Sequence, residues 1–155
     1  MVRWGAQATV LVNRTLELAG QVSGRAGRIT WNFGDGATSE NASCQTSHKW
    51  SVPGDYSVTF TAFNADYLLG VATNLLVTVM PVKAPELLSV QKEGAEVHLW
   101  LGVQPGANYW LEYATNLNPP VSWSALQRVA ATTSMLQLVD TAATNTTRFY
   151  RVTAQ

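Results

Sequence analysis

Apolar residues recur at every second position along much of the chain, in short runs bounded by glycine, proline and asparagine. In residues 56–62, for example, tyrosine, valine, phenylalanine and alanine alternate with serine and threonine. An extended segment with this pattern has one apolar face and one polar face. No segment repeats its apolar residues with a helical period over a sustained length. The pattern therefore predicts an all-β protein.

The alternating runs predict strands in both halves of the chain. They lie at 6–12, 14–22, 27–33, 45–51, 55–64 and 70–80, and at 86–92, 95–103, 108–115, 123–130, 134–139 and 147–154. Pro81 and Pro85 fall between the halves and favour a short, extended connector that restricts the angle between them. We predict two tandem β-sandwiches, at 1–80 and 86–155, joined by a linker at 81–85.

A dense aromatic and glycine motif marks the first half. It consists of Trp31-Asn32-Phe33-Gly34-Asp35-Gly36, His48-Lys49-Trp50 and Pro53-Gly54-Asp55-Tyr56-Ser57-Val58. Proline fixes the first position of a turn and glycine supplies the positive φ of the next, so the third segment predicts a turn that leads into a strand. Tyr56 stands at the head of that strand, where β-sandwiches place a corner tyrosine whose hydroxyl bonds back to the backbone.

This spacing resembles the polycystic-kidney-disease (PKD) domain, an immunoglobulin-like β-sandwich common in secreted and cell-surface proteins. The resemblance implies that Trp31 and Trp50 fill the core and that His48 makes a structural hydrogen bond. Asp35 is expected to cap backbone amides in its own turn, and Tyr56 to be the corner tyrosine. We therefore expect structural roles for all five residues.

The second half carries Tyr109-Trp110-Leu111-Glu112-Tyr113, a later Trp123 and Asp140, and then Arg148-Phe149-Tyr150-Arg151-Val152. This order resembles a fibronectin-III-like domain at the C-terminal ends of large secreted bacterial proteins. The resemblance implies a second immunoglobulin-like sandwich with Trp123 in its core. The run at 147–154 looks like the sixth of seven strands, so we expect one sheet to have an open edge.

Composition narrows the possible partners. Ten basic residues balance ten acidic ones, which gives no electrostatic case for nucleic acid or an anionic membrane. No apolar run is long enough to span a membrane. The single Cys44 excludes a disulfide within the chain, and its polar surroundings indicate an incidental cysteine. No signal peptide is visible at residues 1–5, so we expect a piece of a longer secreted protein, located outside the cell or on its surface.

Candidate chemistry is sparse. Calcium-binding PKD relatives carry an acidic loop ahead of the tryptophan strand, whereas residues 23–28 here contain two arginines and no carboxylate, and Asn32 replaces an aspartate. Since calcium requires six to eight oxygen ligands, several of them anionic, we expect no metal site. His48 and His98 lie in different halves, and alternation turns His98 outward, toward solvent. No nucleophile elbow, zinc motif or phosphate loop is present, so we expect no enzymatic activity and no cofactor.

Exposed aromatic residues are the remaining functional signal. Among the six tryptophans, Trp4 and Trp100 could not be assigned to the core or the surface. Alternation turns Trp110, Phe149 and Arg151 outward on the second domain. An exposed strip of this kind would bind a ligand, contact a neighbouring domain or cover an unpaired strand edge.

These observations predict a non-catalytic extracellular module, a spacer or protein-interaction pair in a larger secreted or surface-attached bacterial protein. Its expected partners are neighbouring domains of that chain and a protein or polysaccharide. The alternative is an accessory carbohydrate-binding module of a secreted hydrolase, which would stack its exposed aromatic rings on sugars.

Overall fold

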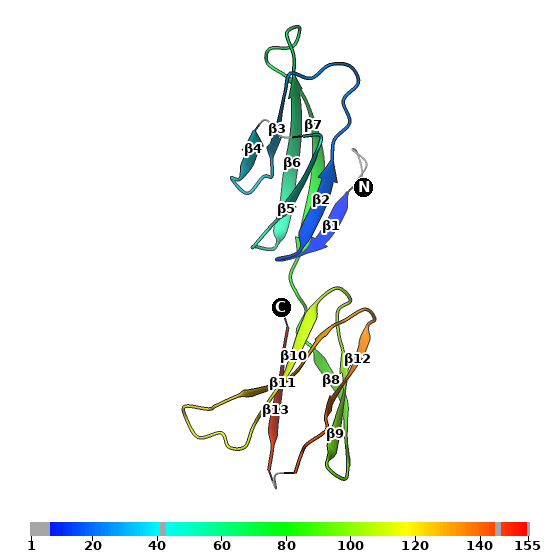
Figure 1. Ribbon diagram of the computed structural model, residues 1–155, viewed down its shortest axis with the longest axis vertical. Coiled ribbons are helices and arrows are strands. Elements are labelled where there is room, and N and C mark those ends of the chain that lie inside the picture. The colour runs from blue at the N-terminus through cyan, green and yellow to red at the C-terminus, as the bar shows by residue number, and fades with distance from the viewer. Residues whose placement is uncertain (1–6, 41–42, 145–146, 155) are drawn as a thin grey trace. The chain divides into compact units, whose positions relative to one another are not determined.

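The computed structural model describes residues 7–40, 43–144 and 147–154 (Figure 1). They form β-strands joined by turns and loops, with no helix within those ranges. The chain divides into two compact units, Met1–Pro81 and Val82–Gln155, which are described separately below. Trp4, whose position the sequence left open, lies outside the described residues.

Within the described residues, the first domain has seven strands. They are β1 (Ala8–Leu11), β2 (Thr15–Ala19), β3 (Arg28–Asn32), β4 (Thr38–Glu40), β5 (Gln45–Lys49), β6 (Gly54–Phe63) and β7 (Val71–Met80). A five-stranded sheet has the order β1-β7-β6-β3-β4, and β2 and β5 form a second, two-stranded sheet. β1 runs parallel to β7, whereas the other pairs are antiparallel.

The core of this domain lies between the two sheets and collects the inward side chains of their strands. Its buried members include Leu18, Ile29, Trp31, Phe33, Trp50, Val58, Phe60, Leu75, Val77 and Val79. Trp31 and Phe60 meet edge to face with ring centroids 4.8 Å apart, a favourable geometry for aromatic pairs. Gly20 permits this packing, because a Cβ atom there would lie 2.6 Å from the Phe60 ring.

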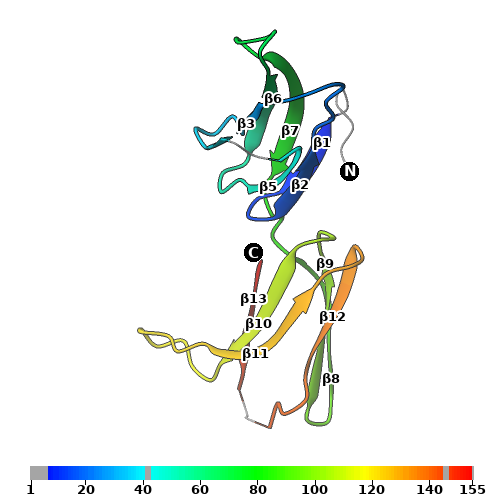
Figure 2. The same cartoon turned by 45° about the horizontal axis from the view of Figure 1, so that its top comes forward.

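In its described residues, the second domain is a sandwich of two three-stranded sheets. Its strands are β8 (Glu86–Glu93), β9 (Glu96–Gly102), β10 (Asn108–Ala114), β11 (Ser124–Ala130), β12 (Met135–Asp140) and β13 (Phe149–Ala154). One sheet has the order β12-β9-β8 and the other β11-β10-β13, and all pairs are antiparallel (Figure 2). Tyr109, Leu111, Leu101 and Leu138 fill the space between the sheets and are almost completely buried.

A buried ion pair joins the end of β12 to the start of β13. Asp140 is only 1% exposed. One of its carboxylate oxygens accepts hydrogen bonds from the Arg148 guanidinium and the Tyr150 hydroxyl, and the other accepts one from the Ala142 amide. Arg148 also donates to the Ala142 carbonyl oxygen and lies over the Tyr113 ring. These contacts fix β13 on the sandwich.

The predicted all-β fold of immunoglobulin-like sandwiches is confirmed. Each predicted strand overlaps an observed one, but β4 was missed because its residues, Thr38–Glu40, are all polar and carry no apolar alternation. The segment predicted as a linker is partly attached to the second domain. The Lys83 amide donates to Gln104 Oε1 (2.7 Å), and the Lys83 carbonyl oxygen accepts from the Tyr109 hydroxyl (3.2 Å).

Candidate interaction surfaces

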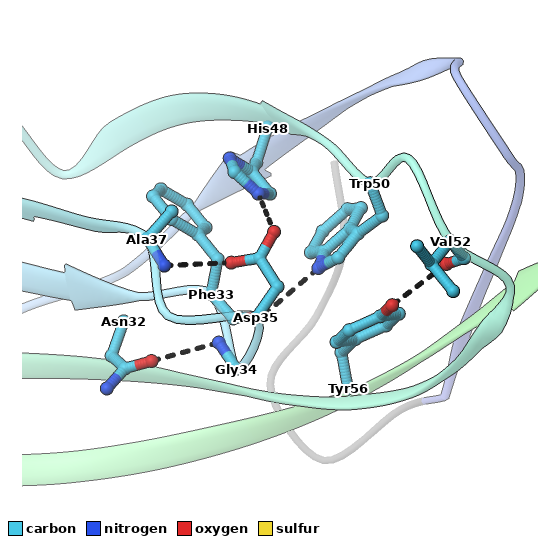
Figure 3. Close-up of polar contacts among 9 residues, drawn as sticks. All are labelled: Asn32, Phe33, Gly34, Asp35, Ala37, His48, Trp50, Val52 and Tyr56. Carbon is cyan, nitrogen blue, oxygen red and sulfur yellow. Dashed lines mark hydrogen bonds and ion pairs between the residues drawn. The ribbon is translucent and has the colours of Figure 1, made fainter.

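The aromatic motif of the first domain forms a continuous internal cluster (Figure 3). Trp31 and Trp50 are completely or almost completely buried. The Trp50 indole N–H donates to the Phe33 carbonyl oxygen (3.1 Å). The His48 ring stacks on Phe33, with centroids 3.9 Å apart, and meets Trp50 edge to face. Phe33, His48 and Trp50 therefore pack against one another.

Asp35 and His48 make a direct polar contact within this cluster. Asp35 Oδ2 lies 2.8 Å from His48 Nε2, and Asp35 Oδ1 accepts a hydrogen bond from the Ala37 amide (3.0 Å). Burial acts to raise the pKa of the Asp35 carboxyl, but the hydrogen bonds from His48 and Ala37 together outweigh it and lower that pKa below its usual value. The carboxylate thus caps its own turn and also holds the histidine ring.

Tyr56 ties the following turn together. Its hydroxyl donates to the carbonyl oxygen of Val52 (2.8 Å), the geometry expected of a corner tyrosine (Figure 3). Asn32 Oδ1 accepts from the Gly34 amide (2.9 Å), so asparagine can shape this turn without an acid. The Asn32 side-chain oxygen, the Asp35 carboxylate and the Tyr56 hydroxyl are thus occupied by contacts within the domain.

The outward face of the β11-β10-β13 sheet carries a different set of residues. Trp110 is half-buried in the central strand β10, opposite Arg128 of β11 and Thr153 of β13. The Arg128 guanidinium lies over the Trp110 ring, 4.7 Å from its centroid. A guanidinium that lies over the face of an indole ring is attracted to it by a modest cation–π interaction. Arg128 had not been predicted as a surface residue of interest.

Arg151 makes two contacts on the same face, and neither is with Trp110. It lies opposite Glu112, and its Nε donates to the Glu112 carboxylate (2.7 Å). Its guanidinium also covers the Trp123 ring, 4.5 Å from the centroid. The expectation that Trp123 lies in the core is wrong: it is half-buried, because it precedes β11 rather than lying within an inward-facing strand position.

Phe149 completes this surface, which we call the arginine–tryptophan face. Phe149 is 37% exposed at the start of β13, and the other members are Trp110, Glu112, Trp123, Arg128 and Arg151. The three residues expected from alternation, Trp110, Phe149 and Arg151, thus share one face, but they are not brought into one contact. Repeated pairing of arginine with tryptophan was visible only after the strand register was known.

The opposite sheet of the second domain carries Trp100 and His98, which lie outward on β9. His98 was expected to be solvated, but its side chain is mostly buried. Its ring stacks on Trp100 (5.8 Å between centroids) and its Nδ1 lies 3.1 Å from Gln137 Nε2. Stacking on Trp100 therefore covers His98, although alternation places it on the solvent-facing side of the sheet.

A cleft in the first domain was not predicted. It lies beside the loop between β6 and β7, has a volume of about 420 Å³, and is lined by residues that include Phe60, Phe63 and Tyr67. The same loop exposes Leu68 (78%) and Leu69 (97%). Large exposed apolar residues that adjoin one another are typical of interaction sites. In the sequence nothing distinguishes these two leucines from other short apolar runs, so their exposure was not predicted.

Neither a metal-binding cluster nor a membrane-spanning helix appears in the part of the chain described. No group of three or more histidine, cysteine, aspartate or glutamate side chains could hold a metal ion there. In the same residues, no helix is long and apolar enough to cross a membrane.

Comparison with known protein families finds a match to the first domain. The fold defines a chain of immunoglobulin-like β-sandwiches. The PKD domain family matches residues 3–77, as the motif had indicated. PKD domains are in general non-catalytic modules of extracellular proteins. No curated protein matches the chain.

Two solved structures show only a distant likeness. One comes from work on the promiscuous specificity of carbohydrate-binding modules of the beta-sandwich superfamily. It is 10% identical, with a TM-score of 0.44 and coverage of 98% of this chain and 93% of that one. The other holds the FN1–FN3 domains of chicken CNTN1; it is 16% identical, has a TM-score of 0.39, and the match covers 99% of this chain but 59% of that one. At these TM-scores neither likeness bears on function.

Proposed function

We propose that the chain is a non-catalytic extracellular interaction module that belongs to a larger secreted or surface-attached protein. The observation that carries this proposal is the arginine–tryptophan face, where aromatic rings and guanidinium groups are displayed together on one sheet. Tryptophan and arginine are enriched at protein–protein interfaces and often dominate their binding energy. The exposed leucines of the β6–β7 loop give the first domain a second surface suited to protein contacts.

The contacts of the face favour a protein partner over a polysaccharide. Arg128 and Arg151 each occupy one face of an indole ring, where a pyranose would have to stack. A sugar would therefore have to displace or avoid these guanidinium groups, whereas a protein partner can use both the rings and the charges. Carbohydrate binding remains the second candidate because Trp110, Trp123 and Phe149 lie on the same sheet face.

Replacement of Trp110 by alanine tests both candidates. If the face mediates assembly, sedimentation velocity should show that Trp110→Ala lowers the oligomeric state of the protein. If it binds polysaccharide, the same variant should lose retention on an insoluble glycan such as cellulose or chitin. Trp100→Ala is the matched control, because Trp100 is also a half-buried outward tryptophan but belongs to the other sheet. If Trp110→Ala behaves like Trp100→Ala in both assays, the proposal is wrong.

A further inference from the structure

The cleft beside the β6–β7 loop of the first domain has the size of a small-molecule site. Residues of the β2–β3 loop, among them Val22 and Arg25, line it together with residues from the adjoining ends of β6 and β7, among them Phe63 and Val71. Small-molecule sites typically have volumes of roughly 300–1,000 Å³ and a mostly apolar lining with few polar groups. The volume of this cleft, about 420 Å³, falls within that range.

Three aromatic side chains line the cleft. Phe60 is only 3% exposed, Phe63 is half-buried, and Tyr67 is 58% exposed. The lining thus extends from a ring in the core of the domain to a ring at the surface. Aromatic rings pack favourably on one another in edge-to-face or offset-stacked arrangements. The cleft therefore favours a ligand that itself contains an aromatic ring.

Hydrogen bonds between two loops hold the walls of the cleft in place. The Asn64 side-chain amide donates from Nδ2 to the Arg25 carbonyl oxygen (3.1 Å). Asn64 Oδ1 accepts hydrogen bonds from the backbone amides of Asp66 (3.0 Å) and Tyr67 (2.8 Å). One side chain thus ties the β2–β3 loop to the loop that carries Tyr67. A site that is already ordered loses less conformational entropy when a ligand binds.

Phe63 is also fixed by contacts within the domain. Its carbonyl oxygen accepts a hydrogen bond from the Gly27 amide (2.8 Å), and the Arg28 guanidinium lies over its ring, 3.9 Å from the centroid. Gly70 approaches the same ring so closely that a Cβ atom there would lie 2.7 Å from it, and its φ of +77° suits glycine. The ring is therefore positioned at the cleft without a ligand.

The lining of the cleft carries a positive charge. Among the described residues that line it, Arg25 is the one that is charged at neutral pH, and none is a carboxylate. Asp66 is exposed and does not line the cleft. The Arg25 guanidinium makes no ion pair with the described part of the chain. An anionic group on a ligand would therefore find its counter-charge in Arg25.

We propose that this cleft binds a small organic anion built on an aromatic ring, such as an aryl carboxylate. The ring packs against Phe63 and Tyr67, and the carboxylate accepts hydrogen bonds from the Arg25 guanidinium. The site takes a small molecule in the first domain, so it goes beyond the role proposed for the arginine–tryptophan face. It is also independent of Leu68 and Leu69, which do not line the cleft.

Two probes that share one ring test the proposal. Indole-3-acetate carries a carboxylate on its indole ring, whereas tryptamine carries an ammonium group. In NMR titrations of the whole chain, indole-3-acetate should shift the amide signals of residues 21–25 and 63–73 in the first domain. It should bind about fivefold more tightly than tryptamine, because Arg25 attracts only the anion. Equal affinity for the two probes, or no shift of these signals at about 10 mM indole-3-acetate, would overturn the proposal.

A substitution in the loop then locates the ring of the ligand. Tyr67→Ala should weaken the binding of indole-3-acetate by about tenfold, because the ligand loses its contact with the tyrosine ring. Leu69→Ala is the matched control, since Leu69 is a 97% exposed side chain of the same loop that does not line the cleft. Equal losses of affinity in the two variants would place the probe on the surface of the loop and overturn the proposal.

A second pair of variants tests the charge. Arg25→Gln should weaken indole-3-acetate about fivefold and should not weaken tryptamine, so the preference between the probes should disappear. Arg14→Gln, in the same domain but away from the cleft, should leave that preference unchanged. Arg25 is exposed, so its replacement leaves the core intact. A preference that survives Arg25→Gln, or that Arg14→Gln abolishes equally, would refute the assignment of the anion to Arg25.

Discussion

Replacement of Asp140 by alanine should destabilise the second domain more than any exposed acidic substitution. The Asp140 carboxylate is nearly inaccessible and accepts hydrogen bonds from the Ala142 amide, the Tyr150 hydroxyl and the Arg148 guanidinium. Its removal deprives all three donors of their shared acceptor. The amide and the hydroxyl lose hydrogen bonds, and a guanidinium that is 9% exposed loses its counter-ion.

The expected cost follows from these contacts. Removal of one partner of a buried ion pair costs about 3–5 kcal/mol, because an uncompensated charge is left in the interior. Arg148 keeps its hydrogen bond to the Ala142 carbonyl oxygen and its contact with the Tyr113 ring, which places the cost near the lower limit. For a small domain with a urea m-value of about 1 kcal/mol/M, about 3 kcal/mol corresponds to a midpoint shift of roughly 3 M.

Urea titration followed by amide NMR signals separates the two domains, because each signal reports its own domain. Signals of the second domain should shift by the stated amount in Asp140→Ala, and those of the first domain should not. Glu96→Ala is the control, since Glu96 is about half exposed and its contact with His98 should contribute less than about 1 kcal/mol. A shift for Asp140→Ala no larger than that of Glu96→Ala would refute the reasoning.

Three further predictions concern pH, packing and metal ions. Burial and the hydrogen bond to Asp140 raise the pKa of Tyr150 from 10.0 to about 12. The protonated hydroxyl therefore stabilises the folded state fully below pH 10.0, and this stabilisation is lost as the pH rises to about 12. Between these pH values the urea midpoint should fall less steeply for Tyr150→Phe than for the parent. Trp31→Ala should lower the unfolding free energy of the first domain by about 3–5 kcal/mol, because it removes a buried side chain. Tyr56→Phe removes the hydrogen bond to the Val52 carbonyl oxygen and should lower it by about 1 kcal/mol. Melting points equal to that of the parent would contradict both assignments. Thermal melts in calcium and in excess chelator should coincide, and a rise of several degrees with calcium would reveal a site.

Local sequence patterns predicted most of the fold, for a physical reason. The side-chain period of a strand is two residues, so a half-buried strand shows in the sequence as alternation. The segment around Val58 and Phe60 has this form, and both side chains are buried in β6. β4 was not predicted, because its pairing with β3 through backbone groups needs no apolar side chain.

The interaction surface was only partly predictable, because it depends on contacts between strands. Alternation places Trp110 and Arg151 outward, but it does not determine which residue of a neighbouring strand lies beside each of them. The register shift between Leu111 and Glu112 in the pairing with β11 decides the partners on that side. As a result Arg151 stacks on Trp123, whereas Trp110 receives Arg128. Such pairings require the three-dimensional register.

The role of Asp140 was also only partly predictable from the sequence. Acidic residues near strand ends normally cap turns, and Asp140 does accept the Ala142 amide. Burial makes the same carboxylate the anchor of Arg148 and Tyr150, residues that lie across an intervening loop. Burial and the three hydrogen bonds also act on its pKa: burial tends to raise it, and the bonds from Ala142, Tyr150 and Arg148 lower it overall. Its stabilising effect is therefore lost as pH falls below the usual aspartate range.

The strongest sequence motif and the proposed binding surfaces serve different purposes in the chain. The polar groups of the PKD motif are engaged inside the first domain: Asp35 with His48 and Ala37, and Tyr56 with Val52. Groups that are already paired have little left to offer a ligand, since binding would first have to break those contacts. The arginine–tryptophan face that we propose for binding lies instead at positions without a family motif, on an outward sheet face. The recognition proposed for this face therefore uses a sheet surface of the second domain, whereas the motif maintains the framework of the first domain.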